Sequence, residues 1–192
     1  MANDYTKGVT PIAKAIYPHL NKPDVRFQKE GVYKVTAELS KDDAQDLLKQ
    51  IEEGLKTAQS ESKSTKTANP PYKIDEDGNY QFNFKCKASG ISKTGQTWEQ
   101  RPKVFDSKGT PIPKETVVWG GTTMKVAYEI IPYSNNMLGS GVSLRLKAVQ
   151  VHDLVSGGGA SADSYGFKEE TSGYVAEASE FSETETNAQE DF

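Results

Sequence analysis

Apolar and polar residues alternate along several stretches of this chain, and each stretch predicts a β-strand with one buried and one solvated side. The clearest stretch runs over residues 80–89. Phe82 and Phe84 share one face there, whereas Lys85 and Lys87 share the other. A solvated face that carries ammonium groups indicates a polyanion as its ligand, and an ordinary wet strand face is the alternative. Similar alternation occurs in residues 32–39, 122–130 and 142–151.

The last of these stretches changes phase near its end. Leu144 and Leu146 share a predicted inward parity with Ala148, but Val149 and Val151 have the opposite parity. An extra residue in one strand of a pair produces such a switch. We therefore expect a β-bulge near the end of this strand.

A helix and a fifth strand complete the expected elements. Apolar residues recur at helical spacing after Ser40, which suits a helix N-cap, so we expect one amphipathic helix over about residues 41–59, packed on the sheet. Residues 97–106 are a candidate strand despite Pro102. Three prolines interrupt residues 1–30, which we interpret as irregular, and the short apolar stretch over residues 9–16 is either an edge strand or an extended N-terminal arm.

Five short strands with one inserted helix are typical of a small barrel, and we predict a mainly β chain with a five-stranded OB-fold barrel. Residues 1–155 form this domain in our interpretation. From residue 156 onward the composition shifts to Gly, Ser, Thr and acidic residues, which predicts a flexible, disordered C-terminal tail over residues 156–192.

Charge is divided unevenly between the two parts. Residues 1–160 contain 22 Lys and Arg against 18 Asp and Glu, whereas residues 161–192 contain one Lys against nine acidic residues. Cys86 is the only cysteine, which excludes an intramolecular disulfide and suits a reducing cytoplasm. No apolar run is long enough to span a bilayer, so we expect no membrane association.

The candidate ligand-binding residues are cations at outward positions and aromatic rings. Single-stranded nucleic acid is bound by cations that follow the phosphates and by flat side chains that stack on bases. Trp119 is expected in the core instead, and Phe105 is compatible with either environment. The candidates are Lys34, Lys85, Lys87, Trp98, Arg101, Lys103, Phe105, Lys125, Tyr133, Arg145 and Lys147.

The sequence contains little that supports catalysis or metal binding. His19 and His152 lie far apart in the chain, without companion ligands or a candidate nucleophile. Asp75, Asp77 and Asn79 begin like a calcium loop, but the ligand-bearing remainder of that motif is missing. We expect no enzymatic activity, no metal and no cofactor.

Six short motifs carry a resemblance to a known family, and they are the segments 31–35, 82–89, 106–109, 120–128, 132–133 and 191–192. Their order and approximate spacing resemble those of the bacteriophage replication-type single-stranded DNA-binding proteins. The resemblance implies an OB-fold and sequence-independent binding of single-stranded DNA in phage replication, recombination and repair, often with strand annealing.

The resemblance also implies roles for particular residues. Lys85 and Tyr133 match basic and aromatic DNA-contacting positions of the family. Asn83, Lys87 and Asn135 depart from its best-known member, which has lysine, tyrosine and tryptophan there, so stacking is expected to involve Trp98 or another ring.

The acidic tail gains a role by the same resemblance. In the family this tail contacts the phage DNA polymerase and helicase-primase and competes with DNA for the cationic surface. Here Glu190, Asp191 and Phe192 form its tip. A solubilising tail is the alternative.

Other functions stay open at this stage. An RNA-binding, cold-shock-like OB module and a protein adaptor that does not touch DNA are the two alternatives. We expect the protein to act in the cytoplasm of an infected bacterial host, and a homodimer is possible.

Overall fold

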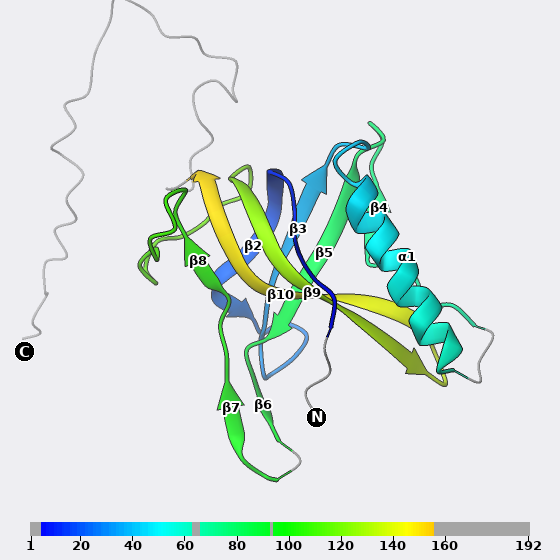
Figure 1. Ribbon diagram of the computed structural model, residues 1–192. Helices are drawn as coiled ribbons and strands as arrows, with labels where there is room; N and C mark the ends of the chain where they lie inside the picture. Colours follow the sequence, from blue (N-terminus) through cyan, green and yellow to red (C-terminus); the bar gives the residue numbers. More distant parts are fainter. Residues whose placement is uncertain (1–4, 63–65, 93, 156–192) are drawn as a thin grey trace, which may run out of the picture. The chain divides into compact units, whose positions relative to one another are not determined.

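The computed structural model describes residues 5–62, 66–92 and 94–155, which form a mainly β structure with one helix (Figure 1). The predicted boundary near residue 155 and the predicted tail over 156–192 lie outside these residues. The elements are β1 (Lys7–Val9), β2 (Ala13–Asp24), β3 (Val32–Leu39), α1 (Gln45–Ser60), β4 (Tyr72–Ile74), β5 (Tyr80–Lys87), β6 (Ser89–Ile91), β7 (Thr97–Glu99), β8 (Lys103–Phe105), β9 (Thr123–Asn135) and β10 (Gly139–Asp153).

Most strands belong to one strongly curved sheet. Its strand order is β1-β9-β2-β3-β5-β10-β8, with β4 on β5 and an additional long pairing between β9 and β10. The sheet does not close into a regular five-stranded barrel. Only two residue pairs connect β5 to β10, and only two connect β2 to β9. Strands β1, β4 and β8 extend it, and β6 with β7 forms a separate hairpin, so the expected count of five strands is wrong.

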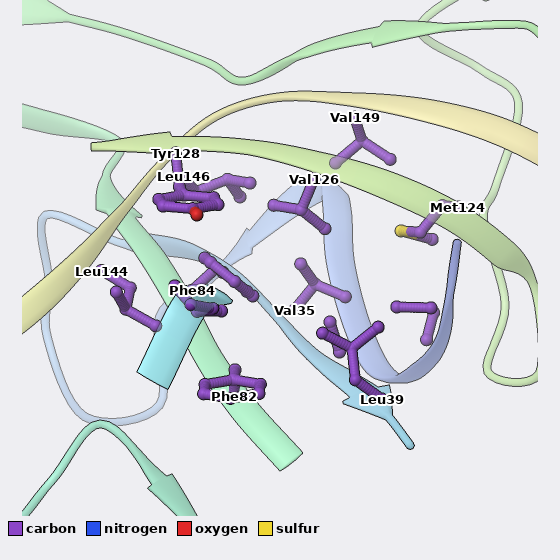
Figure 2. Packing of buried hydrophobic residues seen from close by; sticks show 14 of the residues in the cluster. Val35, Leu39, Phe82, Phe84, Met124, Val126, Tyr128, Leu144, Leu146 and Val149 are labelled. Atoms are coloured by element: carbon purple, nitrogen blue, oxygen red, sulfur yellow. The ribbon is translucent and has the colours of Figure 1, made fainter. Parts of the chain in front are cut away.

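The predicted alternation describes the core correctly. Phe82 and Phe84 of β5 are fully buried, and they pack with Val35, Val126 and Leu144 from β3, β9 and β10 (Figure 2). The phase change in β10 is confirmed as a register shift between its pairs at 146 and 148. The same shift leaves position 148 only half-buried, contrary to its predicted inward placement.

Helix α1 begins four residues later than predicted. Ser40 caps the turn that precedes it, since its hydroxyl accepts a hydrogen bond from the Asp43 N–H at 3.2 Å. The predicted apolar stripe is buried against β9 and β10. Gly54 allows close approach there, because a Cβ at this position would lie 2.8 Å from Cγ2 of Ile130.

The N-terminal region is more regular than predicted. Rather than an irregular arm, it forms the edge strand β1 and the twelve-residue strand β2, which lies between β9 and β3 and not on the edge. Two register shifts accommodate Pro18 and Pro23 inside β2, and Tyr17 takes a left-handed φ of 46° at the first. Prolines break a regular ladder but are tolerated at such irregularities, so their presence did not exclude a strand.

Among the described residues, no helix combines the length and apolar character needed to cross a membrane.

Candidate nucleic-acid interface

One line of charged residues crosses the outer face of the sheet. The strand register places Lys34 beside Lys85, Lys85 beside Arg145, Arg145 beside Glu129, and Glu129 beside Lys7. Directly opposed residues on neighbouring strands point to the same side of a sheet. The alternation that buries Phe84 and Leu144 therefore aligns these five residues, which we call the charged row.

A groove opens along this face at the middle of the charged row. Its volume is about 510 Å³, and β5, β10 and the β7 hairpin strand supply most of its walls. Four cations and one indole predicted from the sequence meet in this cationic groove: Lys85, Lys87, Arg145, Lys147 and Trp98. Val32, Ile131 and Ser143 form part of its floor.

The four cations of the groove differ in their partners. Glu129 binds Arg145, with Oε2 and Nη1 3.2 Å apart, and Lys147, with Oε1 and Nζ 3.5 Å apart. Within the part of the chain that the structure describes, no acidic side chain forms an ion pair with Lys85 or Lys87. The ammonium groups of Lys85 and Lys87 are therefore the ones available to an anionic ligand without a competing carboxylate.

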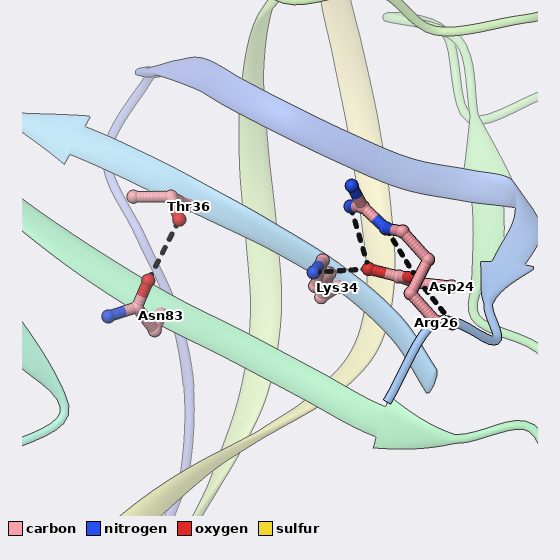
Figure 3. Close-up of polar contacts among 5 residues, drawn as sticks. All are labelled: Asp24, Arg26, Lys34, Thr36 and Asn83. Carbon is pink, nitrogen blue, oxygen red and sulfur yellow. Dashed lines mark hydrogen bonds and ion pairs between the residues drawn. The ribbon is translucent and has the colours of Figure 1, made fainter. Parts of the chain in front are cut away.

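Lys34 lies in the charged row but is held by a carboxylate. Its Nζ is 2.6 Å from Oδ2 of Asp24, whose side chain is 4% exposed (Figure 3). Arg26 binds the same carboxylate through its backbone N–H and its guanidinium, each at 3.0 Å. Hydrogen bonds from Arg26 and then Lys34 hold the pKa of Asp24 far below its usual range. The Asp24 carboxylate thus offsets much of the charge that Lys34 would offer to a ligand.

Two aromatic rings of the outer face lie against cross-strand glycines. Trp98 of β7 covers Gly90 of β6, where an added Cβ would be 2.5 Å from Cζ2 of the indole. Tyr133 of β9 likewise covers Gly141 of β10, with an added Cβ 2.6 Å from its Cζ and Oη. Gly141 precedes Arg145 by four residues on the same strand, or about 13 Å along it. Both rings therefore have one side on the protein backbone.

The remaining predicted cations lie outside the cationic groove. Arg101 lies in a neighbouring cleft with Lys22 and Lys114, and donates a hydrogen bond to the Lys114 carbonyl at 3.5 Å. Phe105 and Lys125 line a separate apolar hollow.

Lys103 and Trp119 also lie outside the cationic groove. Lys103 is exposed on the edge strand β8. Trp119, which we expected in the core, is 43% exposed, because it begins a turn rather than a strand. The tip residues Glu190, Asp191 and Phe192 lie outside the described residues.

Three contributors to this face escape the sequence prediction. Asp24 and Glu129 neutralise predicted DNA-binding cations, and Tyr5 places its ring 5.4 Å from the Arg145 guanidinium carbon. Glu129 does have the outward parity of its strand, so alternation puts it on this face. Its pairing with Arg145 depends on the register between β9 and β10, which alternation does not reveal.

Cys86 lies beneath the cationic groove and is buried. Burial raises the pKa of its thiol to about 11, although the charges of Lys147 and Arg145 act in the opposite direction.

Among the described residues, no group of three or more histidine, cysteine or acidic side chains is arranged to hold a metal ion. The Asp75 carboxylate instead accepts hydrogen bonds from the N–H groups of Asp77 and Asn79, as part of a turn.

Known proteins resemble this chain over most of its length. A family model described as the single-stranded DNA-binding protein of bacteriophage T7 matches residues 63–154. The single-stranded DNA-binding protein of Enterobacteria phage T3 is 33% identical, over 91% of this chain and 87% of the relative.

Solved structures share the fold. The crystal structure of gp2.5, a single-stranded DNA-binding protein encoded by bacteriophage T7, has a TM-score of 0.69 at 30% identity, covering 90% of this chain and 100% of that chain. A single-stranded DNA-binding protein from bacteriophage Enc34, solved in complex with ssDNA, has a TM-score of 0.56 at 16% identity, covering 80% of this chain and 89% of that chain.

Proposed function

This chain belongs to the family of bacteriophage single-stranded DNA-binding proteins, and from that premise we propose that it binds single-stranded DNA in the cationic groove without regard to sequence. The observation that carries the proposal is the meeting of Lys85, Lys87, Arg145 and Lys147 with Trp98 in one groove. Separate strands and a hairpin supply these side chains.

The outer face offers two kinds of contact with such a strand. The ammonium and guanidinium groups of the groove neutralise phosphates and release counterions, which makes binding depend on salt. Trp98 in the groove and Tyr133 outside it present rings on which bases stack, at about 1–3 kcal/mol per base. Phosphates and ring faces occur in every nucleotide, so these contacts carry no sequence information.

The wider role follows from family membership. We propose that the protein protects single strands during phage DNA replication, recombination and repair in the cytoplasm of the infected host, and that it promotes annealing. The OB-fold that the resemblance implies serves as the scaffold, and the protein acts as a binder rather than an enzyme.

The acidic C-terminal segment has a second role in this proposal. Residues 161–192 carry nine acidic residues and one lysine, and they are tethered to a net cationic body. Tethering gives the segment a high effective concentration at the groove, where it competes with DNA. Glu190, Asp191 and Phe192 are proposed to contact the phage DNA polymerase and helicase-primase.

Titration of oligo-dT across a salt series tests the central claim. We expect affinity to fall steeply as salt rises, with weaker binding to duplex DNA of the same length. Lys85→Ala combined with Lys87→Ala should weaken binding and flatten the salt dependence, whereas Lys49→Ala on the exposed face of α1 should not.

Two results would contradict the proposal. Weak binding that does not change with salt would favour a protein adaptor. Clear preference for oligo-U of equal length would favour the RNA-binding alternative.

A further inference from the structure

Glu129 stands out as the one acidic residue of the charged row. We infer that Glu129 limits the affinity of the cationic groove for single-stranded DNA by neutralising part of the charge of Arg145 and Lys147. This inference rests on the proposed function and adds a regulator of the same site.

Glu129 lies beside the groove rather than in it. Its side chain is 11% exposed and does not line the cationic groove, but lines a separate hollow together with Lys7 and Lys147. The two cations that it binds are 41% and 50% exposed, so their charged ends remain within reach of a ligand. One carboxylate therefore acts on two groove cations from outside the groove.

Each carboxylate oxygen of Glu129 binds a different cation. Oε2 meets Arg145 and Oε1 meets Lys147, at 3.2 and 3.5 Å. Arg145 is also oriented by the Tyr5 ring, 5.4 Å from its guanidinium carbon. Arg145 thus keeps an orienting contact that does not depend on the negative charge of Glu129.

A phosphate that binds Arg145 or Lys147 is repelled by the carboxylate beside them. Glu129 reduces the formal charge of the four-cation groove from four to three. At a separation of about 6 Å in a largely solvated setting, one such repulsion corresponds to roughly a three- to tenfold change in affinity. This effect is large enough to measure, and it sets how readily the protein is displaced from DNA.

Glu129→Gln isolates the charge, because the carboxamide keeps an acceptor oxygen for Arg145. In the full-length protein we expect this substitution to tighten oligo-dT binding about three- to tenfold at low salt and to steepen the salt dependence. Glu76→Gln is the matched control, since it removes the same charge from an exposed turn and should leave affinity within about twofold. Equal or weaker binding by Glu129→Gln, with an unchanged melting temperature, would overturn the inference.

A second comparison does not require the Glu129 variant to fold. Lys87→Met and Lys147→Met each remove one groove cation, but among the described residues a carboxylate holds Lys147 and none forms an ion pair with Lys87. We expect Lys147→Met to weaken binding less than Lys87→Met. An equal or larger loss for Lys147→Met would overturn the inference while leaving the proposed function intact. Salt-independent binding by the unmodified protein would overturn both.

Discussion

At the scale of single residues, the acidic neighbours of each lysine or arginine determine how much positive charge it offers to DNA. Lys34 and Lys85 are direct neighbours across β3 and β5 and have the same outward parity. Lys34 forms an ion pair with Asp24, whereas Lys85 has no acidic partner among the described residues. Two lysines that are equivalent in the sequence pattern therefore differ in the charge they offer to DNA.

Lys85→Ala should weaken oligo-dT binding about tenfold and reduce the magnitude of the salt slope by about 0.7, because one free phosphate contact is lost. Lys34→Ala should weaken binding less and instead lower the melting temperature, since the buried Asp24 carboxylate loses one of its two partners. Salt-dependent titrations and thermal melts of both variants check this. A larger affinity loss for Lys34→Ala would contradict it.

Cys86 offers a second test at this scale. The pKa of its thiol is raised from 9.0 to about 11, so at pH 8 only about one thiol in a thousand is ionised. We expect native protein to react with a thiolate-directed alkylating reagent far more slowly than protein unfolded in denaturant. Because the folded state retains the thiol proton to higher pH, this group should lower stability as pH rises from about 9 to about 11. Rapid alkylation of the native protein would contradict the burial of Cys86.

At the scale of secondary-structure elements, two β-hairpins position the aromatic side chains proposed to stack on bases. The β6–β7 hairpin extends from the main sheet and carries Trp98, while the β9–β10 pair carries Tyr133 (Figure 1). Each ring lies on a glycine of the facing strand, which lacks the Cβ that would displace it. These glycines are positioning residues for the proposed stacking.

Gly90→Ala should displace the Trp98 indole, because the new Cβ would lie 2.5 Å from Cζ2. We expect weaker oligo-dT binding and a smaller change of tryptophan fluorescence on binding. Gly141→Ala should resemble Tyr133→Ala, with reduced affinity and a retained fold, since both disturb the same ring. Gly120→Ala is the control, because its Cβ would meet only one atom, 3.9 Å away. Unchanged affinity in both hairpin variants would assign stacking to other rings.

At the scale of the whole molecule, positive and negative charge concentrate in different parts of the chain. The cationic groove belongs to the described fold, whereas residues 172–192 carry six acidic residues and no lysine or arginine. A tethered polyanion lowers the apparent affinity of such a groove for DNA, and salt weakens this competition.

Deletion of residues 172–192 should therefore tighten oligo-dT binding, and the gain should be largest at low salt. Titration of the truncated and full-length proteins at several salt concentrations measures this. A scrambled tail of the same composition is the control for charge alone, and it should restore the lower affinity. Identical affinities for the truncated and full-length proteins would favour a purely solubilising tail.

The parity of the strands, and with it the composition of the core, can be read directly from the sequence. Whether Phe84 points inward and Lys85 outward follows from a two-residue period that is local to β5. The helical stripe of α1 and the bulge in β10 are likewise readable from short windows. These features were predicted because each depends on residues close together in the chain.

Which outward residues meet depends on the tertiary structure. The register between paired strands set Glu129 beside Arg145 and Asp24 near Lys34, and the fold separated Lys125 and Arg101 from the cationic groove. Register is defined by which residues of two strands lie opposite each other, and the periodicity of neither strand encodes it. The length of β2 was not expected for a related reason, since bulges that only the neighbouring strands stabilise accommodate its prolines. Parity determined which face carries the charge, and the pairing of strands decided which of those charges remain available to DNA.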